Sequence, residues 1–299
     1  MTEAEERIRN DLAVQIKEAV RDVRPIPEGH SGFSYWIELE GRRGVLRLPP
    51  PGARIAGPAD IPRQARIMAA LHAQGLPVPA VMATSTEPVV DGRPFVLMEA
   101  IHGDRVEQAI DAGSNPLELA SSAVDVLRRF QAVPIENTGI NAEDPMPLEA
   151  EISRWTWLMD RAPSELTGQA PRLAQLLIER QPRPRPPVLV HGDYHFGNML
   201  FEGGRVVAVV DWEIAQLGQP LLDLCCISLS HVSADSVREM YGADLNDYQW
   251  YRALTYYKYA AIFGYNLMLH RRGKRPDPSY EQRTETILGF IDQGVGVLG

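Results

Sequence analysis

Three side chains that can handle metal ions or protons, Asp193, Asn198 and Asp211, lie close together in the sequence. A short apolar strand leads into a polar loop that contains Asp193 and Asn198. A hairpin predicted over residues 199–210 then places Asp211 at the end of its second strand. Catalytic groups are often carried by loops that rigid strands position. We therefore expect these three side chains to act together.

The spacing of these residues indicates phosphoryl transfer. Asp193 and Asn198 are separated as in the kinase catalytic loop H-R-D-x-x-x-x-N, in which the aspartate is the base and the asparagine a magnesium ligand. Asp211 follows at the position of the second kinase magnesium ligand. Because Mg²⁺ binds hard oxygen ligands and keeps waters and substrate phosphates, one carboxylate and one amide suffice. The alternative is a structural loop in which Asp and Asn only cap the backbone.

The segment HGDYHFGNML, followed by VVDWE, resembles the Brenner motif and the following aspartate of the aminoglycoside phosphotransferase (APH) family. That family belongs to the protein-kinase-like phosphotransferases, with choline and homoserine kinases as relatives. The D-W-E form, with Gly218, Pro220 and Asp223 after it, is similar to a branch found beside acyl-CoA dehydrogenase domains. Members of that branch are associated with phosphorylation of hydroxyacyl-CoA substrates. The resemblance also implies that Asp223 braces the backbone at His191.

The resemblance implies an α+β, bilobal protein-kinase-like fold. A small β-rich lobe over residues 1–101 would bind the nucleotide and end in the hinge. A larger, mainly helical lobe over residues 102–299 would carry the catalytic loop and bind the phosphate acceptor. The resemblance further implies ATP or GTP as phosphate donor, Asp193 as base, and a magnesium cofactor held by Asn198 and Asp211.

The N-terminal part of the chain supplies candidates for nucleotide binding. A turn with Gly29, Ser31 and Gly32 enters an alternating strand, and glycines let backbone N–H groups approach phosphates closely. The same pattern is also typical of a simple hairpin turn. Arg47 lies in the next strand, where the resemblance places the cation that pairs with the α- and β-phosphates. Arginine is permanently charged and binds phosphate oxygens bidentately, whereas the structural alternative is a surface arginine.

Residues 95–101 resemble the hinge between kinase lobes, although periodicity alone indicates a buried strand. In the hinge interpretation, Met98 contributes to an apolar slot. The Glu99 carbonyl and the Ile101 N–H would bond adenine. On the helix predicted over residues 61–74, the family usually offers a glutamate for the strand cation, but this chain has Gln64. A neutral side chain cannot form that ion pair.

Composition limits the partners and the compartment. The formal net charge of −9 argues against an electrostatic grip on nucleic acid. Cys225 and Cys226 are adjacent in an apolar run, which is typical of buried thiols in a reducing cytoplasm. The charged N-terminus has no signal-peptide pattern, and no apolar stretch reaches the ~18 residues of a membrane span. We expect a cytoplasmic protein, monomeric or homodimeric, without membrane or nucleic-acid partners.

Several alternatives remain open at this point. Gln64 suggests a nucleotide-binding pseudokinase, and an atypical protein kinase is also conceivable. However, the short interval between Asp211 and Asp223 leaves no room for a protein-kinase activation segment. The small-molecule acceptor could be an aminoglycoside, a macrolide, a hydroxyacyl-CoA or another alcohol, because fold does not choose among them. We expect His191 to act as a scaffold and Glu213 to contact a metal-bound water or the acceptor.

The resemblance places the acceptor pocket among two helical segments, residues 148–159 and 247–270. Both segments are rich in aromatic residues at helical spacing. Such residues are more often core than pocket. The sequence therefore names no residue that contacts the acceptor.

Overall fold

The computed structural model of this protein describes residues 2–26, 33–242 and 245–299. The chain divides into two compact units, each built from two separate segments. The first unit comprises Met1–Glu143 and His191–Gln216, and the second comprises Asp144–Val190 and Leu217–Gly299. The polar loop and its hairpin therefore belong to the same unit as the N-terminal strands. The lobe boundary after Ile101 remains a prediction.

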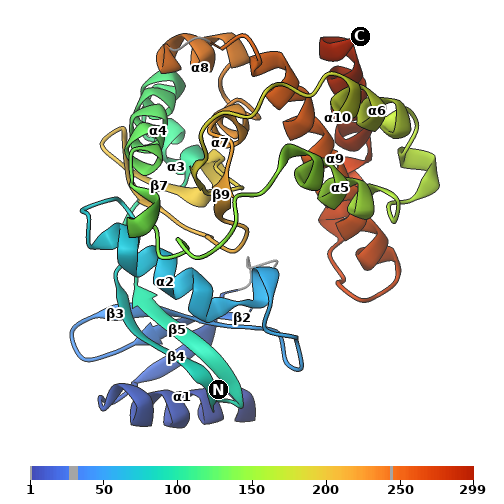
Figure 1. Cartoon of the computed structure of the whole chain (residues 1–299). Helices are drawn as coiled ribbons and strands as arrows, with labels where there is room; N and C mark the ends of the chain where they lie inside the picture. Colours follow the sequence, from blue (N-terminus) through green and yellow to red (C-terminus); the bar gives the residue numbers. More distant parts are fainter. Residues whose placement is uncertain (1, 27–32, 243–244) are drawn as a thin grey trace. The chain divides into compact units, whose positions relative to one another are not determined.

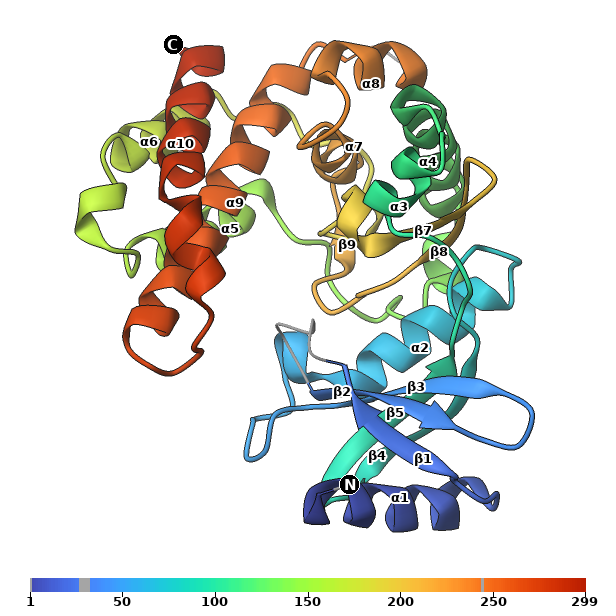
Figure 2. The same cartoon turned by 180° about the vertical axis from the view of Figure 1, so that it is seen from behind.

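The first unit is built on an antiparallel five-stranded sheet with the order β1-β2-β3-β5-β4 (Figures 1 and 2). Its strands are β1 (Asp22–Pro25), β2 (Phe33–Glu38), β3 (Arg43–Leu48), β4 (Val81–Val90) and β5 (Arg93–Glu99). In the central strand β3, Arg47 lies opposite Ser34 on one side and Val96 on the other. Arg47 is thus fixed by hydrogen-bonded strands on both sides.

Helices α1 (Glu3–Ile16) and α2 (Ile61–His72) cover opposite faces of this sheet (Figure 1). Ile8 of α1 is fully buried in a core that includes Leu46 and Leu48 of β3. Because side chains alternate along a strand, Arg47 points to the opposite face from these leucines. Helix α1 ends at Ile16 because Lys17 adopts a left-handed conformation (φ 54°).

The polar loop is packed against a helix within the first unit. Helix α4 lies against β8, and the Tyr194 hydroxyl donates a hydrogen bond of 2.9 Å to the Ala123 carbonyl of α4. Asp104 and Phe201 exchange backbone hydrogen bonds of 2.8 and 2.9 Å. The remaining elements of the first unit are α3 (Val106–Asp111), α4 (Pro116–Gln131), β7 (Met199–Glu202), β8 (Arg205–Val209) and the short 3₁₀ helices η1 (Gly57–Ala59), η2 (Ile135–Asn137) and η4 (Phe196–Asn198). The hairpin predicted after the polar loop is confirmed.

The second unit is mainly helical. Its elements are α5 (Leu148–Met159), η3 (Ser164–Leu166), α6 (Ala170–Glu179), β6 (Val188–Val190), β9 (Gln216–Gly218), α7 (Leu221–Ile227), α8 (Ala234–Tyr241), α9 (Tyr248–Arg271), η5 (Pro278–Arg283) and α10 (Thr284–Leu298). Gln216, the first residue of β9, is counted with the first unit. Helix α9 packs against α5, α7 and α10 (Figure 2). Cys225 and Cys226 are buried free thiols in α7, as predicted. Across the described ranges, no helix combines the length and apolar character that crossing a membrane requires.

Candidate functional site

His191 links the start of the polar loop to the end of strand β8. The ring is 2% exposed, its Nε2 lies 2.9 Å from the Val210 carbonyl, and its Nδ1 accepts the Asp193 N–H at 3.1 Å. These partners require a neutral ring with the proton on Nε2. Burial lowers the pKa of His191 from 6.5 to about 4, against the opposing attraction of Asp193. His191 therefore has the scaffold role that the sequence predicts.

The side chains of Asp193 and Asn198 are bonded to each other. Asn198 Nδ2 donates to the Asp193 carbonyl and to Asp193 Oδ2, both at 2.9 Å. His195 accepts the Gly197 N–H at Nδ1 (3.0 Å), and its Nε2 lies 3.4 Å from Asp193 Oδ2. Because both partners of Nδ2 are acceptors, the orientation of the Asn198 amide is fixed by its hydrogen bonds. Its carbonyl oxygen, Oδ1, has no donor among the described residues.

Asp211 has a strained backbone next to this loop. Its φ of 68° lies in the left-handed region, which costs an aspartate about 1–3 kcal/mol and persists only where the surroundings enforce it. The Val210 N–H donates to the Asn198 carbonyl at 2.9 Å, so Asp211 and Asn198 are neighbours in space. Gly192 also has positive φ (84°), and a Cβ there would lie 2.6 Å from the Ile214 carbonyl oxygen. The polar loop and the segment after β8 thus approach each other closely at a glycine.

Arg47 binds two carboxylates of this segment. Its Nη1 donates to Asp211 Oδ1 at 2.7 Å and its Nη2 to Glu213 Oε2 at 2.6 Å. The side chains of Arg47 and Glu213 are only 11% and 17% exposed. Burial by itself would lower the pKa of the guanidinium, but the attraction and hydrogen bonds of the two carboxylates raise it above its usual value. The pair with Asp211 brings the predicted phosphate-binding cation and the predicted metal ligand together.

Trp212 stands between the two carboxylates and anchors them. It is 1% exposed, its Nε1 donates to the Val209 carbonyl at 3.0 Å, and its ring lies 4.5 Å from His191 and 5.1 Å from Phe130. Burial of this indole holds the tripeptide Asp-Trp-Glu in place. Its two acidic side chains are thereby held on Arg47.

Gln64 stands where the family usually has the glutamate that pairs with the strand cation, and its neutral side chain makes no ionic contact with Arg47. It is 2% exposed, and its Nε2 donates to the Pro58 carbonyl at 2.9 Å. The Glu213 carboxylate accepts a hydrogen bond from Arg47, and its contact with a metal-bound water or the acceptor stays a prediction. Arg47 and Glu213 are 166 positions apart in the sequence, so no short-range sequence pattern predicts their contact.

The predicted hinge residues lie at the end of β5. Met98 is buried opposite Val45, and the Glu99 N–H donates to the Ala80 carbonyl at 2.9 Å, while the Glu99 side chain is exposed. No acceptor for the Ile101 N–H lies among the described residues. This N–H is therefore available to a ligand. The predicted phosphate turn, with Gly29, Ser31 and Gly32, lies outside the described residues.

The oxygen atoms around Asp211 fit a magnesium ion. Asn198 Oδ1 and the second carboxylate oxygen of Asp211 have no hydrogen-bond partner within the described part of the chain. Both are hard oxygen donors, and magnesium needs few protein ligands when phosphates complete its shell. No cluster of three or more His, Cys, Asp or Glu residues suited to another metal occurs in the described ranges. The donor set thus suits magnesium bound together with phosphates.

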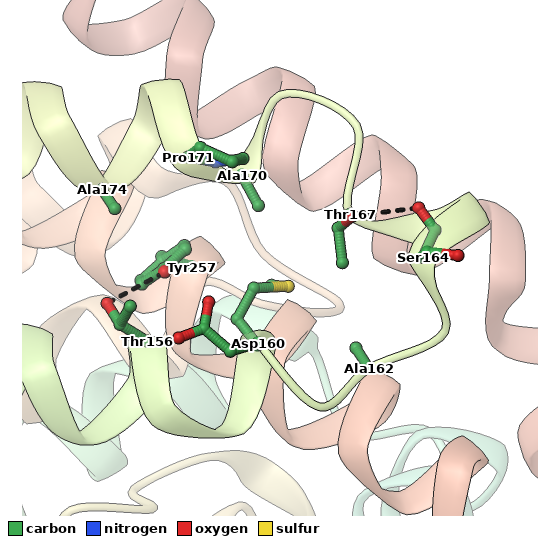
Figure 3. Close-up of a pocket in the computed structure, with 10 residues that line it drawn as sticks. Thr156, Asp160, Ala162, Ser164, Thr167, Ala170, Pro171, Ala174 and Tyr257 are labelled. Carbon is green, nitrogen blue, oxygen red and sulfur yellow. Dashed lines mark hydrogen bonds between the residues drawn. The ribbon is translucent and has the colours of Figure 1, made fainter.

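The second unit contains a pocket of about 320 Å³ between α5, α6 and α9 (Figure 3). Its lining consists mostly of small, hydroxyl-bearing and apolar side chains, with one carboxylate. These residues are Thr156, Met159, Asp160, Ala162, Ser164, Thr167, Ala170, Pro171, Ala174 and Tyr257. The size corresponds to the lower end of small-molecule sites.

Most hydroxyl groups that line this pocket already donate hydrogen bonds within the second unit. The Tyr257 hydroxyl donates to Thr156 Oγ1 at 3.0 Å (Figure 3). Thr156 donates in turn to the Ile152 carbonyl at 2.9 Å. Thr167 donates to the Ser164 carbonyl at 2.9 Å. The Asp160 carboxylate has no hydrogen-bond partner among the described residues. These donors are thus engaged within the unit, and the lone pairs left over suit a ligand with N–H or O–H groups. The family resemblance places an acceptor pocket on α5 and α9, but the sequence named none of the residues that line this one.

Comparison with known sequences places most of the chain in one family. Residues 22–254 match the family model described as "Phosphotransferase enzyme family", APH. Acyl-CoA dehydrogenase family member 10 from Mus musculus is 32% identical over 212 residues, which make up 68% of this chain but 20% of that protein. The chain thus spans about a fifth of the length of this curated relative.

Solved structures show the same fold. A protein from Ralstonia eutropha JMP134, classed with the aminoglycoside phosphotransferases, has 20% identity and a TM-score of 0.76, with 98% of this chain and 97% of that chain covered. The GDP complex of aminoglycoside 2'-phosphotransferase-IIIa has 17% identity and a TM-score of 0.70, with 98% and 99% covered. The predicted α+β kinase-like fold and the predicted family are both confirmed. The chain belongs to the APH phosphotransferase enzyme family.

Proposed function

We propose that this chain transfers the γ-phosphate of ATP or GTP to a hydroxyl group of a small molecule. The observation that carries the proposal is the assembly of Asp193, Asn198, Asp211 and Arg47 in one unit. In kinases, groups of these types serve as base, magnesium ligands and phosphate-binding cation. The strained backbone of Asp211 supports the proposal, since such strain clusters at functional sites.

Each residue has a distinct role in this proposal. Asp193, held by Asn198 Nδ2, orients the acceptor hydroxyl and takes its proton. Arg47 binds phosphate oxygens of the nucleotide. Magnesium held by Asn198 Oδ1 and Asp211 would neutralise charge that develops on the transferred phosphoryl group. Positioning of the two reactants supplies much of the remaining rate enhancement.

Nucleotide recognition falls to the end of β5. The Ile101 N–H and the Glu99 carbonyl bond the base, and Met98 contributes apolar surface beside it. Support comes from the available N–H of Ile101 and from the fold shared with a phosphotransferase solved with GDP. The choice between ATP and GTP is made by the same backbone groups, so parallel titrations with both nucleotides measure it.

Two observations favour different acceptors. The sequence similarity to part of an acyl-CoA dehydrogenase family member supports a hydroxyacyl-CoA. The pocket of the second unit, with Asp160 and Thr167 as acceptors, favours an alcohol rich in N–H and O–H groups, such as an amino alcohol or an aminoglycoside. We assign this pocket to the acceptor because the family resemblance places acceptor binding on α5 and α9.

The test is a coupled assay of nucleotide consumption with magnesium, run over hydroxyacyl-CoAs, amino alcohols, aminoglycosides and macrolides. We expect acceptor-dependent turnover with one class and a phosphate ester of that acceptor in the mass spectrum. Calorimetric binding of ATP or GTP without turnover on any acceptor would instead favour a nucleotide-binding pseudokinase. Absence of both binding and turnover would contradict the proposed function.

A further inference from the structure

Arg47 has a different kind of partner from the corresponding cation of protein kinases. In those enzymes, the strand lysine pairs with a glutamate of the helix that follows. Here the helix that follows β3 is α2, and its Gln64 is neutral and donates to the Pro58 carbonyl. The carboxylates on Arg47 instead come from Asp211 and Glu213, which are far away in sequence.

The short segment around Trp212 explains how both carboxylates reach one guanidinium. The buried indole fixes the middle of the segment through its packing on Phe130 and its bond to the Val209 carbonyl. The flanking side chains of Asp211 and Glu213 then bind Nη1 and Nη2 separately, at 2.7 and 2.6 Å. The two carboxylates therefore contact different nitrogen atoms of the guanidinium group.

The two carboxylates differ in exposure, and this difference separates their roles beside Arg47. Arg47 is 11% exposed, and a buried charge that loses its partner is strongly destabilising. Asp211 is the more exposed carboxylate, at 32%, and has an oxygen left for a metal. If Asp211 binds a metal ion, its negative charge is shared between the metal and Arg47. Glu213, which is 17% exposed, still neutralises the charge of Arg47.

We propose that Glu213 positions Arg47 for the nucleotide phosphates, in the role that a helix glutamate has in protein kinases. This inference rests on the proposed phosphotransferase mechanism and concerns a positioning residue. Arg47 is then held by the segment that also carries Asp211. The positions of Arg47, the phosphate-binding cation, and Asp211, the metal ligand, are consequently coupled. Their geometry does not depend on an ionic contact from α2.

The test compares Glu213→Gln with Glu143→Gln in the chain of 299 residues. Glu143 is a matched control because it also bonds an arginine of the first unit through both oxygens, Arg63, at 2.7 and 2.6 Å. Calorimetry measures the Kd of ATP with and without magnesium, and steady-state kinetics separate KM from kcat. We expect Glu213→Gln to weaken ATP binding about tenfold or more, with a larger rise in KM than fall in kcat. Glu143→Gln should stay within about twofold of wild type.

Two further variants keep the test decisive. Glu213→Asp retains the charge on a shorter side chain, so its ATP affinity should lie between those of wild type and Glu213→Gln. Gln64→Ala should leave ATP affinity within about twofold of wild type, because Gln64 makes no ionic contact. Thermal denaturation confirms that each variant is folded before binding is measured.

The outcomes separate this inference from the proposed function. If wild type binds ATP and Glu213→Gln binds it equally well, the inference is overturned while the proposed function stands. A loss in Gln64→Ala as large as that in Glu213→Gln would also overturn it. Wild type that binds neither ATP nor GTP would overturn both.

Discussion

The two units of this protein hold their polar groups in different ways. In the first unit, Arg47 bonds both Asp211 and Glu213, and Asn198 bonds Asp193. In the pocket of the second unit, the Asp160 carboxylate has no hydrogen-bond partner among the described residues. One region is a preorganised network of charges, and the other keeps acceptor atoms available for a ligand.

This difference assigns different tasks to the two regions. A network that fixes charges in advance suits a reaction whose transition state is stabilised by positioning and electrostatics. A pocket whose hydrogen-bond acceptors have no partner in the protein suits ligand recognition. Exchanging a few of its side chains alters which ligand can form hydrogen bonds there. We therefore expect substitutions in the first unit to affect turnover or nucleotide binding. Substitutions in the pocket should affect acceptor affinity alone.

Asp211→Asn should give the largest effect. The change removes the charge that Arg47 binds and weakens the proposed metal ligand, so kcat should fall about a thousandfold. Steady-state turnover with magnesium and ATP measures this fall. Asp160→Asn in the second unit serves as the matched control, and its kcat should remain close to wild type. A kcat for Asp211→Asn within tenfold of wild type would contradict the assignment of catalysis to the charge network of the first unit and of recognition to the pocket of the second.

His191 should make stability depend on pH in the first unit. Burial lowers its pKa to about 4 in the folded chain, whereas the unfolded chain binds the proton near 6.5. The unfolded state therefore binds more protons between these values, and the free energy of unfolding falls as the pH drops through this window. The contribution is fully present above pH 6.5 and amounts to about 3 kcal/mol.

Chemical denaturation of wild type and His191→Gln between pH 7 and 4 measures this contribution. The stability of His191→Gln should change less steeply with pH than that of wild type. His102→Gln, at an exposed position of the same unit, should follow the wild-type slope. Parallel slopes for wild type and His191→Gln would show that His191 is not held neutral.

The smallest effect is expected in the pocket. Asp160→Asn should raise the KM for the hydroxyl substrate roughly three- to tenfold, because one charged acceptor is lost. The Kd for ATP should not change. Asp235→Asn, at an exposed position on α8, is the control within the same unit. An altered ATP affinity together with an unchanged acceptor KM would reverse the assignment of the pocket.

The sequence predicted that Asp193, Asn198 and Asp211 lie close together, and there is a physical reason for this. Asp193 and Asn198 lie in one short loop, and the hairpin that follows is encoded by alternating residues and a glycine turn. Asp211 must therefore emerge beside them, and the Val210–Asn198 hydrogen bond confirms that it does. Local spacing was sufficient because each relation spans one loop or one hairpin.

Long-range partners could not be predicted in this way. Arg47 and Asp211 are 164 positions apart, and their contact depends on which face of β3 the arginine occupies. The family resemblance pointed to the position of Gln64 for the partner of the strand cation, but distant Glu213 supplies the second carboxylate on Arg47. Helical spacing also could not separate Tyr251, which lies outside the pocket lining, from Tyr257, which lines the pocket, since both are buried on the same helix.

Some elements were missed because their signals are short or late in the chain. Strand β1 covers only Asp22–Pro25 and ends in a proline, which is unusual in a paired strand. Helix α10 places Ile287, Ile291 and Leu298 in the core, at a helical period that could have been detected. Neither element carries a residue of the proposed catalytic site.

The most direct test of the central claim is turnover and ATP binding of Asp193→Asn, measured on one preparation. Asn preserves size but cannot accept the proton of the acceptor hydroxyl. We expect kcat to fall about a hundredfold while the Kd for ATP stays at the wild-type value. Near wild-type turnover, or a loss of ATP affinity that matches the loss of turnover, would contradict the role of Asp193 as the base.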